Sequence, residues 1–244
     1  MLHASSNWYD ATVIRIQDES PSTKRFWVNI PEPEPFEFKA GQFVTMDLPV
    51  HEKRLNRWRS YSIANGPGEG NTLEFCIVHM NGGLATQYFF EEVKEGTVLR
   101  LKGPDGGFVL PEQLDKTLVL VCTGTGIAPF RSMIRDIHRR KLPFKGIHLI
   151  FGTRREDGIL YREEFEAYRD LWPNFRYDIA LSREPDWAGY KGYVHQVYLE
   201  HYPAPREDVV FYLCGWQNMI DEAVANLIVK TGFDKSQVRY ELYG

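Results

Sequence analysis

The sequence predicts two domains, an N-terminal antiparallel Greek-key β-barrel and a C-terminal α/β domain built on a parallel sheet. Short strand-like segments separated by Pro- and Gly-rich turns run through residues 8–110, which is typical of an antiparallel barrel or sandwich. After Gly107, apolar runs alternate with helical segments, which indicates a parallel sheet with helices on both faces. We expect the domains to span residues 1–111 and 112–244, and the hydrophobic content of 43% is enough for two cores.

Six segments of the first half are predicted as strands. They are YDATVIRIQDES (9–20), KRFWVNI (24–30), GQFVTMDLP (41–49), RSYSIAN (59–65), TLEFCIVHM (72–80) and TVLRLKG (97–103). The breaks between them contain Pro and Gly, as in PEPEP at 31–35, NGPGEGN at 65–71 and GPDGG at 103–107. One helix is expected over residues 84–96, entered from Gly82-Gly83.

The second half is predicted to contain five parallel strands. They are TLVLVC (117–122), GIHLIFGTR (146–154), FRYDIALSR (175–183), VVFYLCG (209–215) and VRYELYG (238–244). Helices are expected over residues 127–141, 161–172 and 219–233, between successive strands. In a sheet of this kind, ligands bind at the carboxyl ends of the strands.

Composition excludes several classes of protein. The net charge of −4 is not that of a nucleic-acid-binding protein. We also expect no transmembrane helix, because no run of 18 apolar residues occurs, and no signal peptide at MLHASSNWYD. The three cysteines, Cys76, Cys122 and Cys214, are too far apart for an iron–sulfur site, and their odd number argues against a disulfide framework. A reducing, cytoplasmic location and a site without metal are therefore expected.

A glycine-containing loop follows the first buried strand of the second half. Gly124, Thr125 and Gly126 stand between this strand and a helix, where backbone N–H groups and the helix dipole favour an anion. Cys214 and Gly215 end a later strand and are expected at the same edge. The same residues could also form a tight turn and a small buried hydrophobe, and the loop lacks the third glycine of the GxGxxG pattern.

Basic and hydroxyl side chains follow two other strands of this half. Arg154 ends the second strand, and Ser182 and Arg183 end the third, with Tyr190 close behind. An arginine suits a phosphate dianion, so these residues are candidates for binding a nucleotide phosphate. A solvated loop would have similar composition.

The segment RSYSIAN (59–65) is a candidate ligand-binding segment in the first half. Alternation puts Arg59, Tyr61 and Ile63 on one face of a strand, with Ser60, Ser62 and Ala64 on the other. The tyrosine could stack on a flat ring and the arginine could pair with a pyrophosphate, although an ordinary strand with a buried tyrosine would look alike. A second possible phosphate-binding helix start contains Gly82, Gly83, Leu84 and Thr86.

Taken together, these motifs resemble the ferredoxin–NADP⁺ reductase family from about residue 8 to residue 243. The matching stretches, in order, are RSYS, GGLAT, GPDGGF, TGTGIAP, LYREEF, LSRE, YLCG and ELY. The resemblance implies a barrel that binds FAD and a parallel-sheet domain that binds a pyridine nucleotide.

The resemblance also implies roles for individual residues. Arg59 would meet the FAD pyrophosphate, Tyr61 would stack on the isoalloxazine ring and Ser62 would lie near its N5 atom. Thr86 stands where the family often has serine. Tyr243 would cover the flavin face, although Gly244 follows it here, whereas the plant-type members end at the tyrosine. The predicted catalytic residues, which would line the site of hydride transfer, are Ser62, Cys214, Glu241 and Tyr243.

The predicted activity is that of an FAD-dependent NAD(P)H oxidoreductase that exchanges single electrons with a separate ferredoxin or flavodoxin. NADPH is favoured over NADH by Ser182 and Arg183, while Glu184 leaves NADH open. We expect a monomer that docks its acidic carrier on basic residues, namely Lys53, Arg54, Arg57, Arg59, Arg135, Arg139, Arg140 and Lys141.

Other functions remain open at this stage. The chain could be the NADH-dependent reductase component of a multicomponent oxygenase. It could instead be a non-catalytic, flavin-binding regulatory or electron-transfer subunit, or a reductase of free flavin or ferric iron. Nucleotide preference, turnover and retention of FAD distinguish these alternatives.

Overall fold

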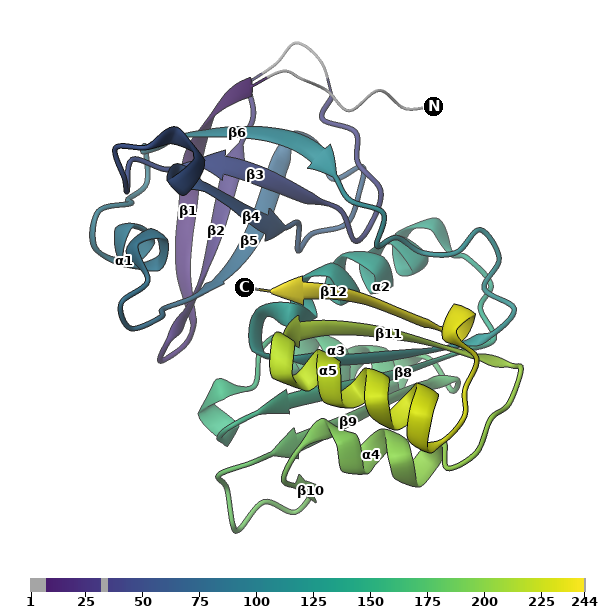
Figure 1. The fold of residues 1–244 in the computed structure, drawn as a ribbon. Helices are drawn as coiled ribbons and strands as arrows, with labels where there is room; N and C mark the ends of the chain where they lie inside the picture. The colour runs from purple at the N-terminus through teal and green to yellow at the C-terminus, as the bar shows by residue number, and fades with distance from the viewer. Residues whose placement is uncertain (1–7, 32–34, 244) are drawn as a thin grey trace. The chain divides into compact units, whose positions relative to one another are not determined.

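The computed structural model describes residues 8–31 and 35–243, and contacts divide the chain into two compact units (Figure 1). Unit 1 contains Met1–Leu110 and Ala128–Lys141, and unit 2 contains Pro111–Ile127 and Leu142–Gly244. The expectations about the chain start, the centre of the PEPEP loop and Gly244 fall outside the described residues.

Unit 1 is built on a six-stranded antiparallel sheet, as predicted. Its strands are β1 (Trp8–Ser20), β2 (Thr23–Asn29), β3 (Phe43–Asp47), β4 (Trp58–Ser62), β5 (Thr72–Val78) and β6 (Val98–Asp105), in the spatial order β4-β3-β6-β1-β2-β5. The two edge strands are joined beyond the end of β4, where the Ala64 amide donates to the Glu74 carbonyl oxygen over 2.8 Å. This bond closes the sheet into a barrel (Figure 1).

The core of the barrel contains inward-facing apolar residues of β1, β2, β3, β5 and β6, and Tyr61 of β4 packs against it partly buried. Helix α1 (Leu84–Glu91) adds Ala85 and Phe89 to this core, and Phe89 lies 5.1 Å from Phe26 between ring centroids. A short 3₁₀ turn, η1 (Arg54–Arg57), precedes β4.

Unit 2 is built on a parallel sheet. Its strands are β7 (Thr117–Thr123), β8 (Gly146–Thr153), β9 (Phe175–Leu181), β10 (Tyr190–Lys191), β11 (Val209–Trp216) and β12 (Val238–Tyr243), in the order β10-β9-β8-β7-β11-β12. The five predicted strands are confirmed. The prediction missed β10, whose two residues are too few to carry a periodic signal. The strand order reverses between β7 and β11, and such a switch point is where ligands bind in sheets of this class.

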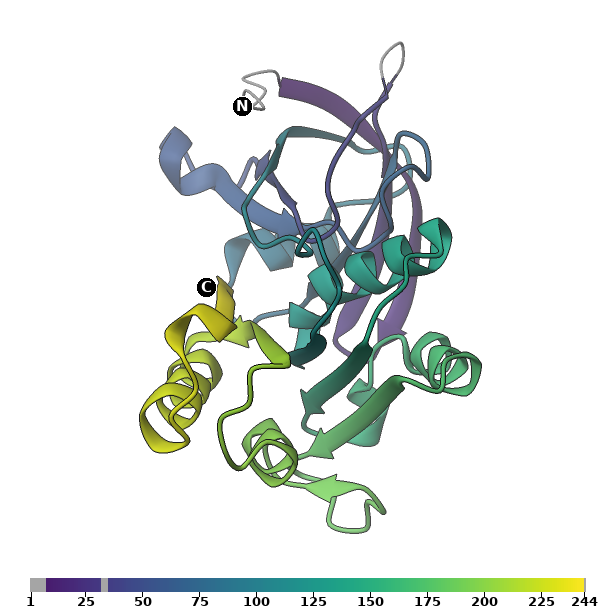
Figure 2. The same cartoon turned by 90° about the vertical axis from the view of Figure 1, so that its right-hand side faces the viewer.

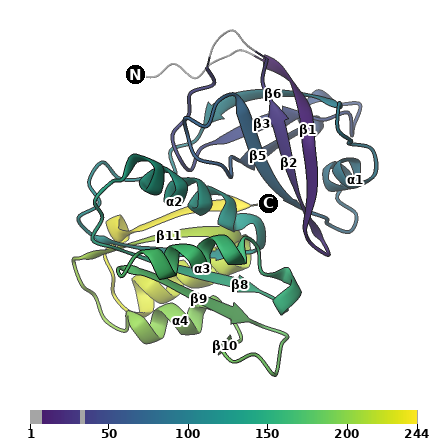
Figure 3. The same cartoon turned by 180° about the vertical axis from the view of Figure 1, so that it is seen from behind.

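Helices cover both faces of this sheet, as Figures 1 and 3 show from opposite sides. The helices α4 (Val194–His201) and α5 (Gln217–Val224) pack on one face, and α3 (Arg162–Leu171) packs on the other. A π-helical segment, η4 (Ala225–Lys230), continues α5, so one predicted helix changes its winding part of the way along. Helix α4 was not predicted, although Val194, Val197 and Tyr198 have helical spacing.

Helix α2 (Ala128–Arg140) follows β7 in the chain but groups with the barrel by its contacts, beside the strands of unit 1 in Figure 2. It is joined to unit 2 by Ile127 and by the segment after Lys141, a residue with a left-handed φ of 51°. The boundary at 111/112 stays a prediction. Because α2 groups with unit 1, the chain also passes between the two units at each end of this helix. No helix in the described part of the chain is long and apolar enough to span a bilayer.

Candidate functional site

The residues predicted to meet a flavin start on β4, an edge strand of the barrel. Tyr61 pairs with Val44 of β3, and its ring lies 5.4 Å from that of Phe89 in α1 at 78°. Burial raises the pKa of Tyr61, although the neighbouring Arg59 opposes this, so the phenol stays neutral. A neutral aromatic ring fixed at its edge by a second ring is suited to stacking on a flat ligand.

Arg59 is held by the backbone around it. Its Nη1 atom donates to the carbonyl oxygens of Asn56 (3.0 Å) and Trp58 (2.7 Å). These bonds do not engage the N–H groups on Nε and Nη2, which suit a phosphate oxygen. Ser62 ends β4 and is 5% exposed. The expected alternation stops there, because the next four residues are also buried.

The start of α1 offers a second group of donors in unit 1. Its N-cap residue is Gly83, which has no side chain to occupy the first N–H groups, and its first turn lacks an acidic residue. The Thr86 hydroxyl donates to the Gly83 carbonyl oxygen over 3.0 Å and accepts from the Met80 amide over 3.1 Å. Gly82 (φ 76°) has open space where a Cβ would lie, and Leu84 is 52% exposed. This turn fits an anionic group.

In unit 2, the glycine loop packs closely against the neighbouring strand end. A Cβ on Gly126 would lie 2.3 Å from the Cys214 carbonyl oxygen, and a Cβ on Gly215 would lie 2.5 Å from the Thr123 hydroxyl. Only glycine allows this approach of β7 and β11. Gly124, with φ of 52°, has nothing within 4 Å of its missing Cβ, so this side of the Gly124–Ile127 turn is open.

The Thr123 hydroxyl provides a direct test of whether this edge fits a ligand. Its oxygen is buried and has no hydrogen-bond partner among the described residues. Buried polar atoms are nearly always paired in native proteins, so an orphan hydroxyl at the strand-order switch point indicates a group that a ligand satisfies. The glycine turn beside it supplies backbone N–H donors, as a nucleotide phosphate requires.

Cys214, Glu241 and Tyr243 are brought together by strand pairing. Cys214 pairs with Glu241, and Trp216 pairs with Tyr243, between β11 and β12. The Cys214 thiol is fully buried, and burial is the main reason that its pKa lies well above the ordinary value, with Glu241 adding to the effect. Cys214 is therefore a neutral thiol and not a nucleophile.

The predicted phosphate-binding residues of unit 2 also lie at one edge. The Ser182 amide donates to the Thr153 carbonyl oxygen over 3.0 Å, and the Arg183 amide donates to that of Arg154 over 2.8 Å. The side chains of Arg154 and Arg183 are exposed, as binding a phosphate requires. Glu156 and Glu184 share this edge through a bond of 3.4 Å from the Glu156 amide to the Glu184 carboxylate. This end of the sheet therefore carries both guanidinium groups and carboxylates.

Tyr190 differs from this group. Its hydroxyl donates to the Glu200 carboxylate over 3.1 Å and lies 2.9 Å from Nε2 of His201, so the ring is tied to α4. A cavity of about 500 Å³ lies beside it, lined by residues of α3, β9 and the loop before β10, including Arg162 and Trp187. A role for Tyr190 in nucleotide binding stays a prediction.

Four of the eight cations of the expected docking surface are already paired with carboxylates. Arg57 contacts Asp47 at 2.8 Å, Arg135 contacts Glu69 at 2.9 Å, and Arg139 and Arg140 both contact Asp136. Their field toward an acidic partner is therefore weaker than the sequence indicates. The guanidinium of Arg54 instead lies 5.3 Å from the centre of the Trp58 ring.

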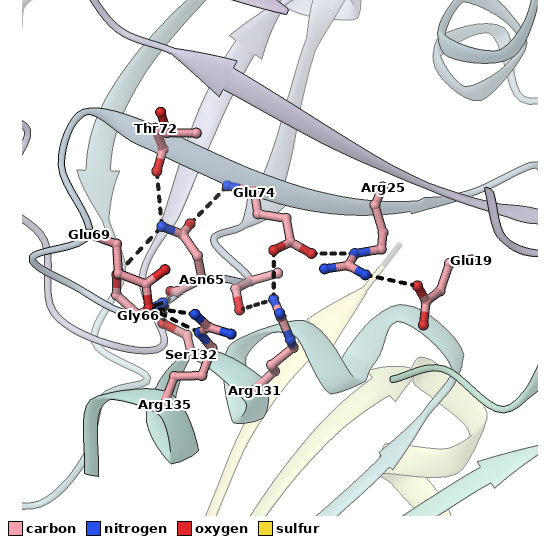
Figure 4. Close-up of polar contacts among 11 residues, drawn as sticks. Glu19, Arg25, Asn65, Gly66, Glu69, Thr72, Glu74, Arg131, Ser132 and Arg135 are labelled. Carbon is pink, nitrogen blue, oxygen red and sulfur yellow. Dashed lines mark hydrogen bonds and ion pairs between the residues drawn. The ribbon is translucent and has the colours of Figure 1, made fainter. Parts of the chain in front are cut away.

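Sequence reasoning missed a buried ion network between α2 and the barrel (Figure 4). Glu74 of β5 contacts Arg131 of α2 at 2.8 Å and Arg25 of β2 at 2.6 Å, and Arg25 contacts Glu19 at 3.3 Å. The available signals were a glutamate inside an apolar strand and an arginine on the apolar face of a helix, which a single sequence cannot pair.

Comparison with protein families identifies two domain types. Residues 10–110 match the oxidoreductase FAD-binding domain, and residues 120–225 match the oxidoreductase NAD-binding domain. Together these matches include β4 and the glycine loop.

Curated relatives align over nearly the whole chain. The phenol hydroxylase P5 protein of Acinetobacter pittii is 33% identical over 93% of this chain, and this chain spans 63% of its length. A protein from Sorangium cellulosum, ferredoxin–NADP reductase B, is 29% identical over 96% of this chain and 97% of its own. The chain thus spans less than two thirds of one relative and nearly all of the other.

Solved structures share the fold. The Amycolatopsis cytochrome P450 reductase GcoB superposes with a TM-score of 0.86 at 28% identity, over 97% of this chain and 69% of that one. A ferredoxin NADP⁺ reductase from Neisseria gonorrhoeae, solved with FAD and NADP bound, superposes at 0.82 over 98% and 99% of the chains. At 22% identity, the second comparison supports the fold alone.

Proposed function

Because the chain belongs to the ferredoxin reductase-like family of FAD- and NAD-binding oxidoreductases, we propose that it moves electrons between NADPH and a separate one-electron carrier protein. The observation that carries this proposal is the orphan Thr123 hydroxyl beside the Gly126–Cys214 contact, at the strand-order switch point of a domain that matches the NAD-binding type. When bound, FAD supplies the chemistry by accepting a hydride and releasing single electrons.

The chain's own residues bind and orient the two rings. We assign Arg59 and the Gly82–Thr86 turn to the FAD phosphates, and Tyr61 to one face of the flavin. Ser62, Cys214, Glu241 and Tyr243 are assigned to the place where nicotinamide and flavin meet. Because the Cys214 thiol is neutral and fully buried, we assign it the role of packing behind the ring site and excluding water, not of taking up a proton.

For the nucleotide, we assign Gly124, Thr125, Gly126 and Gly215 to the pyrophosphate region. Arg154, Ser182 and Arg183 are assigned to the 2′-phosphate of NADPH, which the exposed guanidinium groups favour. The carboxylates of Glu156 and Glu184 at the same edge favour the free ribose hydroxyls of NADH, so NADH is the second candidate.

The carrier is proposed to be a ferredoxin or flavodoxin that docks on the basic residues of unit 1. We also propose a monomer. We place it in the cytoplasm because none of the three described cysteines forms a disulfide. Relatives named as reductase components support a separate partner protein.

Steady-state kinetics test this proposal. The purified chain, reconstituted with FAD, is assayed with NADPH or NADH while ferredoxins and flavodoxins are added one at a time and cytochrome c reduction is recorded. We expect carrier-dependent turnover with NADPH. A yellow protein that reduces neither the carriers nor ferricyanide with either nucleotide would support the non-catalytic alternative.

A second candidate is the reductase component of a multicomponent oxygenase. The relatives from phenol hydroxylase systems, at 33% and 31% identity over 93% of this chain, favour it. This candidate predicts a preference for NADH and direct reduction of an oxygenase partner in the same assay.

A further inference from the structure

Helix α2 begins directly after the glycine loop and packs its buried face on the barrel. Nine of its 13 residues are buried, including the polar residues Arg131, Ser132 and Asp136. A helix this deeply buried moves with the body on which it packs, and its contacts place it with unit 1.

Two of these polar residues bond the end of the RSYSIAN segment. Arg131 Nη1 donates to the Ala64 carbonyl oxygen over 3.0 Å, and the Ser132 hydroxyl donates to the Asn65 carbonyl oxygen over 2.7 Å (Figure 4). Ala64 is two residues beyond Ser62, so these bonds fix the backbone that leads out of β4.

The loop after this segment is fixed in the same way. The Asn65 side chain donates to the Thr72 carbonyl oxygen over 2.9 Å and accepts from the Glu74 amide over 2.8 Å. Arg135, one turn after Arg131, contacts Glu69. The α2 helix therefore bonds the connection between β4 and β5 at Ala64, Asn65 and Glu69.

The charges of the network balance, but charge balance alone does not explain why ionised side chains are buried here. The side chains of Arg131 and Glu74 are each 3% exposed, and Arg25 and Glu19 complete two opposite pairs. Burying ions has a large desolvation cost, and well-packed apolar residues usually stabilise a core as well. What apolar residues cannot do is donate a hydrogen bond to a chosen carbonyl oxygen, such as that of Ala64.

We infer that Arg131 and Ser132 are positioning residues that connect nucleotide binding at the Gly124–Ile127 turn to the flavin-binding segment. The inference rests on the proposed function. A phosphate bound on the turn restrains the start of α2. Arg131 lies one turn further along this helix, and its hydrogen bond to Ala64 restrains the backbone that follows Ser62. Glu74 keeps the Arg131 guanidinium in place.

Two variants distinguish a connection between nucleotide binding and the flavin-binding segment from a purely structural role of Arg131 and Ser132. Ser132→Ala removes the bond to Asn65 and leaves no buried charge. The double variant Arg131→Met/Glu74→Gln removes both charges together, and Arg25 keeps its contact with Glu19. Lys145→Met is the control, because it removes an exposed ion pair with Asp208 in unit 2 and no contact of α2.

The experiment records three quantities for each FAD-loaded protein: the melting temperature, the change in the flavin absorption spectrum on adding NADP⁺, and the rate of flavin reduction at saturating NADPH. We expect melting temperatures within about 5 °C of wild type. We also expect both variants to lose at least half of the NADP⁺-induced spectral change and to be reduced about tenfold more slowly. The Kd for NADP⁺ should change less than about threefold, and Lys145→Met should match wild type.

The outcomes are distinguishable. If wild type responds to the nucleotide and both variants respond equally, this inference is overturned and the proposed function stands. If wild type binds FAD but shows neither a spectral change nor reduction, the proposed function fails and this inference fails with it. If the double variant does not fold, Ser132→Ala alone decides, with the same expected result.

Discussion

The two glycine turns that precede α1 and α2 have the same predicted role but different surroundings. Around Gly83, the space of a missing Cβ is limited most closely by the Thr86 hydroxyl, 2.9 Å away, which is the end of a side chain, while the Met80 carbonyl oxygen lies at 3.2 Å. Around Gly126, the limit is the backbone carbonyl of Cys214, 2.3 Å away in the neighbouring strand. The first turn is fixed by its own helix, and the second is fixed by the sheet.

This difference indicates how each turn tolerates change. A side chain can rotate away from a new methyl group, whereas a buried strand cannot shift without disturbing its ladder. Substitutions in the first turn should therefore affect its ligand only, and those in the second should affect stability and ligand together.

Gly126→Ala is expected to have the largest effect. The new methyl group should push the turn away from β11, lowering the free energy of unfolding by about 2–3 kcal/mol. It should also lower kcat/KM for NADPH by about 100-fold. Thermal melts and steady-state kinetics measure the two effects. The control for the stability effect is Gly124→Ala, where only the left-handed φ should cost about 1 kcal/mol. Equal effects at both positions would contradict the interlocked arrangement.

Arg183→Ala tests the same sheet edge without touching its packing. Loss of a charge-assisted bond to the 2′-phosphate should lower kcat/KM for NADPH by about 10- to 100-fold. The value for NADH should change less than about threefold, and melting should be unchanged. Arg155→Ala, an exposed neighbouring position, serves as the control. Equal losses for both nucleotides would remove the basis for preferring NADPH.

Gly83→Ala tests the first turn and should act more weakly. The methyl group would crowd the N-terminus of α1, so the Kd for FAD should rise about tenfold while the melting temperature of the apoprotein changes by less than about 4 °C. Fluorescence titration with FAD measures the affinity. Gln87→Ala on the exposed face of α1 should leave it unchanged. A loss of stability as large as that of Gly126→Ala would refute the contrast between the two turns.

The smallest expected effect concerns pH. Burial alone would raise the pKa of Glu74, but Arg131 and Arg25 outweigh it and hold the pKa below the ordinary value of 4.5. A carboxylate with a lowered pKa stabilises the fold above that ordinary value, and the contribution is lost as pH falls through the lower folded-state pKa. Melting temperatures from pH 7 to about pH 3 should fall more steeply for wild type than for Arg131→Met/Glu74→Gln. Parallel curves would show that Glu74 is not ionised in the fold.

Much of the fold could be predicted because each half has a clear period. Short segments between Pro- and Gly-rich breaks identified the six barrel strands. The continuous apolar run of β7 and the strand–helix succession after it identified β8, β9, β11 and β12. The topology then gathers Gly126, Arg154, Ser182 and Cys214 at strand ends, which needs no knowledge of side-chain contacts. Helix α4 was missed because eight residues carry few repeats of a helical pattern.

The contacts around α2 could not be predicted, for a physical reason. Glu74 and Arg131 are 57 residues apart, and each looks like a fault in an apolar pattern when considered alone. Only the packed structure pairs them. The bond of Tyr190 to α4 is a similar case, since its partners Glu200 and His201 lie on the helix that was missed.

The central claim is that a flavin held by unit 1 receives electrons from a nucleotide held by unit 2. Anaerobic single-turnover mixing of the FAD-loaded chain with one equivalent of NADPH, followed by visible absorbance, tests it most directly. The account predicts that the flavin absorbance bleaches by two electrons per chain, and that Tyr61→Ala loses its FAD on gel filtration. Retention of full absorbance by the wild-type protein, with NADPH and also with NADH, would contradict it.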